Sequence, residues 1–147
     1  MSEENKAIFR RLFEEFWVKG KLDVADELLA PNFVFHDCCA EEPLDLEGYK
    51  QDVMEYVSSC SDIQATVEDI IAEGDKVAVR YTWNAIHTGG LLGAPPTDKR
   101  LTIKLITILR IADGKVVAEW DAYDSLDMNR QLGLIPAENR QGHQNQR

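Results

Sequence analysis

The chain has 147 residues, of which 44% are hydrophobic, and its formal net charge of -10 gives a sequence pI near 4.7. A single domain of this length buries about two thirds of the surface that its unfolded chain would expose, so it needs no cross-links to be stable. The acidic balance excludes a nucleic-acid binder with a basic patch and disfavours anionic membranes, and no apolar run approaches the roughly 20 residues that span a bilayer.

The cysteines and the start of the chain predict the compartment. Cys38, Cys39 and Cys60 are odd in number, and two of them are adjacent and poorly placed for a mutual disulfide. The first residues, M-S-E-E-N-K, contain neither a basic n-region nor an apolar h-region, so no secretory signal is expected. We therefore expect reduced thiols in a cytoplasmic protein.

Three helices are predicted in the first part of the chain. The first begins at Ser2 and stops at Gly20, and its apolar residues recur at helical spacing: Ile8, Phe9, Leu12, Phe13, Phe16 and Trp17. A short helix over residues 22–29 follows, and then an extended segment over 33–37 with Val34 and His36 on the side opposite its aromatics. After a loop over 38–45, a third helix is expected over 46–57.

From Asp62 the apolar residues alternate instead, which predicts strands over 63–72, 77–87, 101–111 and 115–123. Asp113-Gly114 makes a tight turn before the last strand, and a short helix over 126–132, capped by Ser125, ends at Gly133. Three helices before an antiparallel meander predict an α+β fold in which a curved sheet wraps the helices. We expect one domain over residues 1–136 and a disordered tail over 137–147.

The candidate chemistry lies where apolar strand faces end in polar groups. If the last strand alternates regularly, Trp120 and Asp124 lie on its apolar side. Asp121 then faces the other way, as a solvated or sheet-pairing acid. His87 ends the face of another strand that carries Tyr81 and Trp83. If the sheet curls, Asp124 and His87 point into one apolar cavity, where burial raises the pKa of a carboxyl group and makes proton transfer useful.

Each candidate also has an ordinary structural interpretation. Asp124 can serve as the N-terminal contact of the following helix, and His87 can be satisfied by a loop carbonyl. His36 can be a core or surface residue, and Trp83 and Trp120 can simply fill a core.

The sequence lacks the motifs of phosphate binding, zinc binding and serine nucleophiles. The pair Gly89-Gly90 is followed by a segment that cannot open a helix, so no phosphate loop is expected. The sequence contains no H-x-x-x-H or C-x-x-C pair for zinc and no G-x-S-x-G nucleophile. Acids, histidines and an apolar chamber suit proton transfer next to a carbonyl.

Four motifs together resemble one family. They are H-T-G at residues 87–89, G-x-P-P-T at 93–97, D-G-K at 113–115 and W-x-x-x-D-x6-Q-L-G from Trp120 to Gly133. In order and spacing they resemble the SnoaL-like polyketide cyclases (ester cyclases) of the NTF2-like superfamily, over residues from about 5 to 136. The sequence departs from the family at Asp98, where a glycine is frequent, and in the loop Cys38–Glu42; both changes concern the mouth of the expected pocket.

The resemblance implies an α+β cone that holds a small hydrophobic carbonyl compound, with no cofactor and no metal. It also implies a homodimer or homotetramer that associates through the outer sheet face, and an intramolecular aldol ring closure. Asp124 would be the general acid/base, and His87 would stabilise the enolate. The residues expected to contact the substrate are Trp83, Trp120, His36, Tyr81 and Phe16. The alternative is a non-catalytic module of the same fold that binds a small hydrophobe or supports assembly.

Overall fold

The computed structural model describes residues 2–136. Its elements are α1 (Ser2–Arg11), η1 (Leu12–Val18), α2 (Leu22–Leu28), β1 (Leu29–Asp37), α3 (Leu46–Ser58), β2 (Cys60–Glu73), β3 (Lys76–His87), β4 (Arg100–Ala112), β5 (Lys115–Tyr123) and α4 (Ser125–Gln131). The tail expected over 137–147 lies outside the described residues. No helix within 2–136 is long and apolar enough to cross a membrane.

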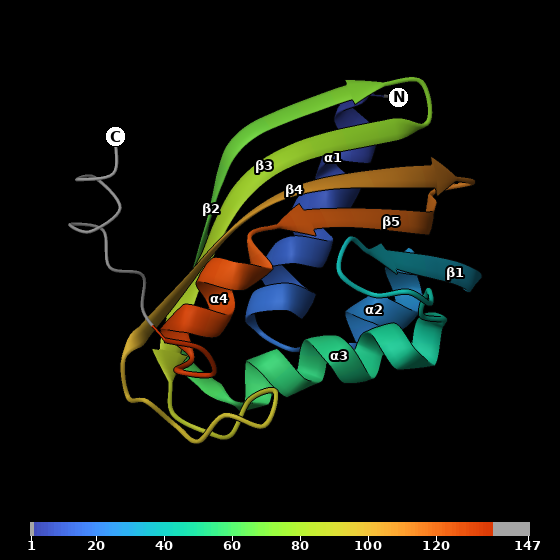
Figure 1. Ribbon diagram of the computed structural model, residues 1–147. Helices are drawn as coiled ribbons and strands as arrows, with labels where there is room; N and C mark the ends of the chain where they lie inside the picture. Colours follow the sequence, from blue (N-terminus) through green and yellow to red (C-terminus); the bar gives the residue numbers. More distant parts are fainter. Residues whose placement is uncertain (1, 137–147) are drawn as a thin grey trace.

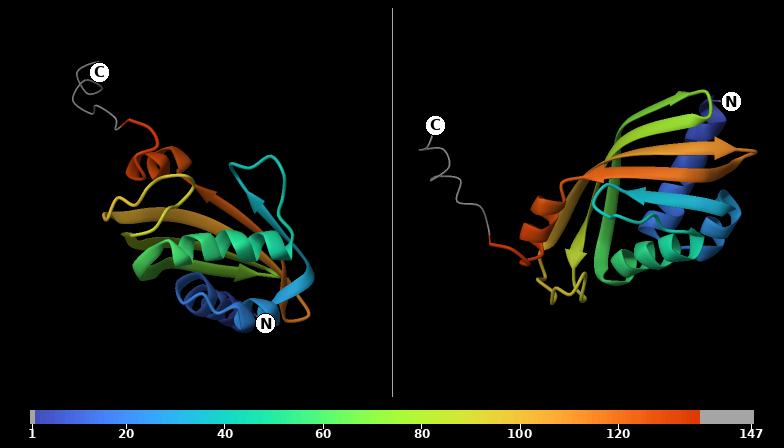
Figure 2. Two further views of the ribbon diagram at one scale, coloured as in Figure 1. Left: turned by 90° about the horizontal axis from the view of Figure 1, so that it is seen from below. Right: turned by 45° about the vertical axis from the view of Figure 1, so that its right-hand side comes forward.

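The strands form one five-stranded sheet in the order β1-β5-β4-β3-β2. Only the β1–β5 pair is parallel among the described strands, and the other three pairs are antiparallel. The long strands bend, and α1, α2 and α3 lie on the inner side of the bend, while α4 follows the end of β5 (Figures 1 and 2). The expected α+β cone with a curved, mostly antiparallel sheet is thereby confirmed.

Alternation predicts the inner faces of β3 and β4 correctly. Every second residue of both strands is buried: Val77, Val79, Tyr81, Trp83, Ala85 and His87 on β3, and Leu101, Ile103, Leu105, Thr107, Leu109 and Ile111 on β4. The two strands pair in register along this whole length, so their apolar faces form one continuous wall against the helices.

Alternation assigns the side chains of β5 to the wrong faces of the sheet beyond Val116, because the strand contains a β-bulge. Arg110 of β4 pairs with Ala118 and the next residue, Ile111, pairs with Val116, so Val117 is an extra residue on β5. One extra residue reverses the alternation that follows it. Asp121 is therefore buried, and Trp120 lies on the outer side of the sheet.

The first helix and the start of the last helix differ from their predictions. The first predicted helix consists of α1 and a π-helical segment, η1, which runs on to Val18. The N-cap of α4 is Asp124, whose side chain accepts a hydrogen bond from the Asp127 N–H, and not Ser125. Gly133 has a φ of 77° after α4, as expected for a residue that ends a helix in the left-handed region.

Candidate active site

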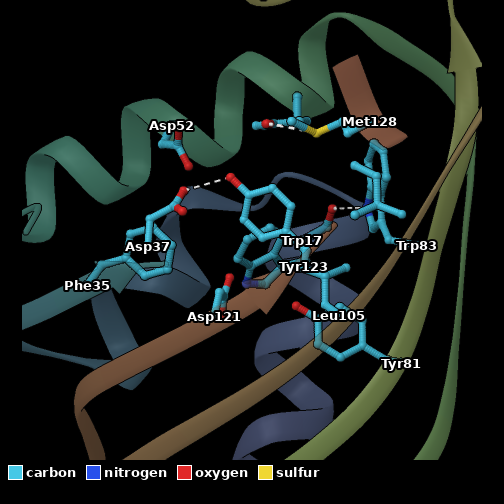
Figure 3. A pocket seen from close by; sticks show the side chains of 12 residues that line it. Trp17, Phe35, Asp37, Asp52, Tyr81, Trp83, Leu105, Asp121, Tyr123 and Met128 are labelled. Atoms are coloured by element: carbon cyan, nitrogen blue, oxygen red, sulfur yellow. Dashed lines mark hydrogen bonds between the residues drawn. The ribbon is translucent and has the colours of Figure 1, made fainter. Parts of the chain in front are cut away.

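A cavity opens between the inner sheet face and the helices η1, α3 and α4 (Figure 3). Atoms leave about 480 Å³ free along its walls, a volume that includes open solvent. Its walls are mainly aromatic and aliphatic, with three carboxyl groups among them: Trp17, Phe35, Asp37, Asp52, Tyr56, Tyr81, Trp83, Ile103, Leu105, Asp121, Tyr123 and Met128. The described chain thus provides an apolar chamber with acids in its walls, which is a setting for proton transfer.

Two of the acids lie side by side because their strands are parallel neighbours. Asp37 ends β1 and pairs directly with Asp121 of β5. The Asp37 carboxylate also accepts a hydrogen bond of 3.0 Å from the Tyr123 hydroxyl, two residues beyond Asp121 on the same face. Asp52 points toward this pair from α3 (Figure 3).

Asp121 sits in the driest of the three positions, since only 5% of it is exposed. Thr107 pairs with it across β4 and β5, and the Thr107 hydroxyl donates a hydrogen bond of 2.7 Å to its Oδ1. The Tyr81 hydroxyl lies 3.2 Å from Thr107 Oγ1 and can donate to it, because the Thr107 proton is directed to the carboxylate. Burial raises the pKa of Asp121 from 3.8 to about 6, against the lowering effect of its hydrogen bonds.

Glu119 lies behind Asp121 on the same face of β5 and is completely buried. Its Oε1 accepts a hydrogen bond of 2.9 Å from Tyr49, whose hydroxyl oxygen accepts one of 2.8 Å from Trp17 Nε1. Burial and the nearby Asp121 carboxylate raise the pKa of Glu119 well above its usual 4.5. Burial therefore favours the neutral, protonated form of Glu119.

The wall contributed by α3 carries a second acid and a hydroxyl group. Burial, followed by the charges of Asp37 and Glu55, raises the pKa of Asp52 to about 6. Burial and the charge of Asp52 raise the pKa of Tyr56, so its hydroxyl stays protonated. That hydroxyl donates to the sulfur of Met128 at 3.7 Å, and a thioether is a weak acceptor. Tyr56 can therefore offer its proton to a better acceptor in the cavity.

The structure does not bring the two predicted catalytic residues together, so the prediction of a shared cavity is wrong. Asp124 is exposed and caps α4 outside the cavity lined by Asp121. His87 is fully buried, but its Nδ1 accepts a hydrogen bond of 3.2 Å from the Thr97 N–H, and it is not part of the cavity wall. For Asp124 the physical reason is the bulge in β5, which turns inward the residues that alternation had placed outside. His87 lies on the inner face of β3 as predicted, but its ring contacts Thr97 of the following loop.

The residues expected to contact substrate divide between the two sides of the sheet. Tyr81 and Trp83 line the cavity. Trp120 and His36 pair on adjacent strands outside it and stack with ring centroids 5.2 Å apart. Phe16 is buried against Tyr49, and the next residue along, Trp17, lines the cavity in its place.

None of the three cavity acids was predicted from the sequence as a site residue, although one signal pointed to them. Thr107 interrupts an otherwise apolar face of β4 and is buried there. A buried hydroxyl group needs a hydrogen-bond partner, so its presence predicts a polar residue on a neighbouring strand. Asp121 is that residue.

An α+β cone whose sheet and helices enclose such a cavity is an NTF2-like fold. The model of one family, SnoaL-like polyketide cyclase, matches residues 7–132. The chain belongs to this family.

Named relatives agree with this assignment. The chain is 29% identical to the nogalonic acid methyl ester cyclase of Streptomyces nogalater over 123 residues, which cover 78% of this chain and 87% of the relative. Among solved structures it is similar to AclR of Streptomyces galilaeus, assigned as a hydroxylase, with a TM-score of 0.88, 26% identity and coverage of 99% of this chain and 91% of AclR. It is also similar to IdmH of Streptomyces antibioticus, assigned as a polyketide cyclase, with a TM-score of 0.74, 31% identity and coverage of 88% and 98%.

Proposed function

We propose that this protein is a cyclase that needs no cofactor and closes a ring in a small polyketide-like carbonyl compound, with Asp121 as its general base. The observation that carries the proposal is the buried Asp121 carboxyl group in the wall of an aromatic cavity. With a pKa of about 6, this group is mostly ionised at neutral pH and yet more basic than an ordinary aspartate. The sequence had suggested Asp124 for this role.

In the proposed reaction, Asp121 removes a proton from the carbon next to a carbonyl group. The electron pair moves to the carbonyl oxygen, and the Tyr56 hydroxyl donates a hydrogen bond to the enolate that forms. The enolate carbon then attacks a second carbonyl of the same molecule, which forms the ring bond and an alkoxide. Protonated Asp121 returns its proton to that alkoxide, so the protein ends the cycle unchanged.

Thr107 is the positioning residue of this proposal. Its hydroxyl donates a hydrogen bond to Asp121 Oδ1 and so fixes the orientation of the carboxyl group in the cavity wall. Glu119 lies behind Asp121, and because burial favours its neutral form, the Asp121 carboxylate is not opposed by a second buried negative charge.

The charge of the cavity favours a neutral substrate. Three carboxyl groups stand in its wall, and no lysine, arginine or histidine is among its lining residues in the described chain. An anionic ligand would face like charges at short range. This favours a methyl ester over the corresponding free acid, and the names of two relatives, nogalonic acid methyl ester cyclase and aklanonic acid methyl ester cyclase, contain such an ester.

The test compares Asp121→Asn with Asp124→Asn on these two methyl esters and on their free acids. We expect Asp121→Asn to lower kcat/KM by at least about 100-fold, the usual contribution of a general base, and to retain ligand binding. Asp124→Asn should stay within about threefold of the wild type, since asparagine caps a helix about as well as aspartate. The free acids should be turned over at least about tenfold more slowly than the esters.

Two outcomes would contradict the proposal in different ways. Unchanged turnover in Asp121→Asn would reject Asp121 as the base and leave the cyclase activity in place. Binding of the esters by the wild type without any turnover would favour the alternative, a non-catalytic module of this fold that binds small hydrophobic molecules.

A further inference from the structure

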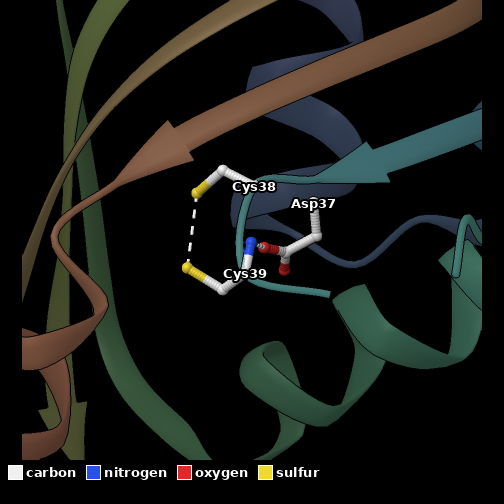
Figure 4. A group of neighbouring side chains, drawn as sticks. All are labelled: Asp37, Cys38 and Cys39. Atoms are coloured by element: carbon white, nitrogen blue, oxygen red, sulfur yellow. Dashed lines mark hydrogen bonds between the residues drawn. The ribbon is translucent and has the colours of Figure 1, made fainter. Parts of the chain in front are cut away.

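The loop that leaves β1 brings two adjacent cysteines to the same side of the chain (Figure 4). The Sγ atoms of Cys38 and Cys39 lie 3.4 Å apart. A carboxylate oxygen of Asp37 joins them, and the three atoms all lie within 4.8 Å of one another. Adjacent side chains of an extended strand point to opposite faces, so this convergence depends on the turn that begins where β1 ends.

Hydrogen bonds hold this turn in place. The Cys39 N–H donates to Asp37 Oδ1 at 2.8 Å, and the Ala40 N–H donates to the Asp37 carbonyl oxygen at 3.2 Å. The Cys38 N–H donates to the carbonyl oxygen of Asp121 on β5 at 3.1 Å. The two sulfur atoms are thus presented together by the fold itself and are both exposed.

Two thiols and one carboxyl group are a ligand set for a thiophilic divalent cation. Zinc binds thiolate sulfur at about 2.3 Å, so two thiolates of a tetrahedral site lie about 3.8 Å apart. The observed 3.4 Å between the sulfur atoms has to widen by only a few tenths of an ångström. Thiolates select zinc over magnesium and calcium, and a water molecule can complete the four ligands.

The charge around the turn favours a cation as well. Residues 37–45 include Asp37, Glu41, Glu42 and Asp45 and contain no lysine or arginine. A divalent cation would reduce the repulsion between these acidic side chains.

We propose that Cys38, Cys39 and Asp37 bind one Zn²⁺ ion per chain, at the edge of the cavity that Asp37 also lines. The absence of a C-x-x-C pair argues against zinc on sequence grounds, but that criterion does not cover adjacent cysteines in a turn. Neither thiol belongs to the cavity wall, so the two cysteines take no part in the proposed cyclase chemistry, and Asp37 is the residue that the two sites share.

The test is a metal titration of the full chain, freed of metal and kept reduced with a phosphine. Cd²⁺ reports thiolate ligation through its ultraviolet charge-transfer absorption, and Zn²⁺ is then measured by competition against Cd²⁺. We expect one ion per chain, and two protons released for each ion bound. Cys38→Ser and Cys39→Ser should each weaken binding by about 100-fold, and Asp37→Asn by about tenfold.

Cys60→Ser is the matched control, because Cys60 is the remaining cysteine and lies at the start of β2. It should bind the ion as the wild type does. Unchanged affinity in either Cys38→Ser or Cys39→Ser, loss of binding in Cys60→Ser, one ion shared by two chains, or no binding of Cd²⁺ at micromolar concentration would each overturn the proposal. Urea unfolding of every variant checks that a loss of affinity does not come from a loss of fold.

Discussion

Replacing Asp121 by asparagine is expected to stabilise the protein at neutral pH and much less in acid. Folding raises the pKa of this carboxyl group from 3.8 to about 6. Each pKa unit corresponds to about 1.4 kcal/mol, so the ionised carboxylate costs the folded state about 3 kcal/mol relative to the protonated form. The asparagine amide is neutral at every pH and carries no such cost.

The sign of the pH dependence follows from proton binding. Between pH 3.8 and about 6 the folded state holds a proton on Asp121 that the unfolded state has already lost. Wild-type stability therefore falls as the pH rises through this window, and the full cost is present above it. The stability of Asp121→Asn relative to the wild type should rise by about 2.4 kcal/mol between pH 4 and pH 8.

Urea unfolding at several pH values measures this difference, and the titrations of groups that Asp121 does not influence cancel in the comparison. Asp124→Asn is the control and should change stability at pH 8 by less than about 0.5 kcal/mol, since both residues are good N-caps. If the advantage of Asp121→Asn does not grow between pH 4 and pH 8, or if it grows in the opposite direction, the carboxyl group is not desolvated and the reasoning fails.

Three further predictions concern the scaffold and the assembly. Tyr49→Phe removes the hydroxyl donor to buried Glu119 and should cost about 1–3 kcal/mol in urea unfolding; a change below about 0.5 kcal/mol would mean that the bond is not needed. Asp45→Ala removes the side-chain cap on the Gly48 N–H at the start of α3 and should cost about 1 kcal/mol, whereas unchanged stability would show that the cap adds nothing. Ile106, 54% exposed on the outer sheet face, should lie in the expected dimer or tetramer interface, so Ile106→Lys should yield monomers in analytical ultracentrifugation, and an unchanged mass would exclude this face.

The sequence predicts most of the fold because its strands alternate regularly and its helices have clear ends. The alternation on β3 and β4 matches the buried residues one by one. It fails on β5, where the extra residue Val117 shifts every later side chain to the other face. Nothing local marks Val117 as a bulge, since valine is an ordinary strand residue and the irregularity appears only in the pairing with β4.

The candidate site depended on that single shift. If β5 alternated without interruption, the acid on its inner face near the end of the strand would be Asp124. Because of the bulge it is Asp121, which lies beside Asp37 of the parallel strand β1. Parallel pairing of β1 with β5 is a long-range feature that periodicity within each strand does not reveal. Thr107 is the polar residue on the predicted inner face of β4, and it indicates where the buried carboxyl group lies.

The most direct test of the central claim is a carbon-13 NMR titration of the Asp121 carboxyl group in the full chain, with Asp121→Asn used to assign the signal. A midpoint near pH 6 is predicted, because burial in the cavity wall outweighs the hydrogen bonds that favour the carboxylate. A midpoint at or below the ordinary aspartate value of 3.8 would contradict the claim, since such a group is neither desolvated nor basic enough for the proposed chemistry.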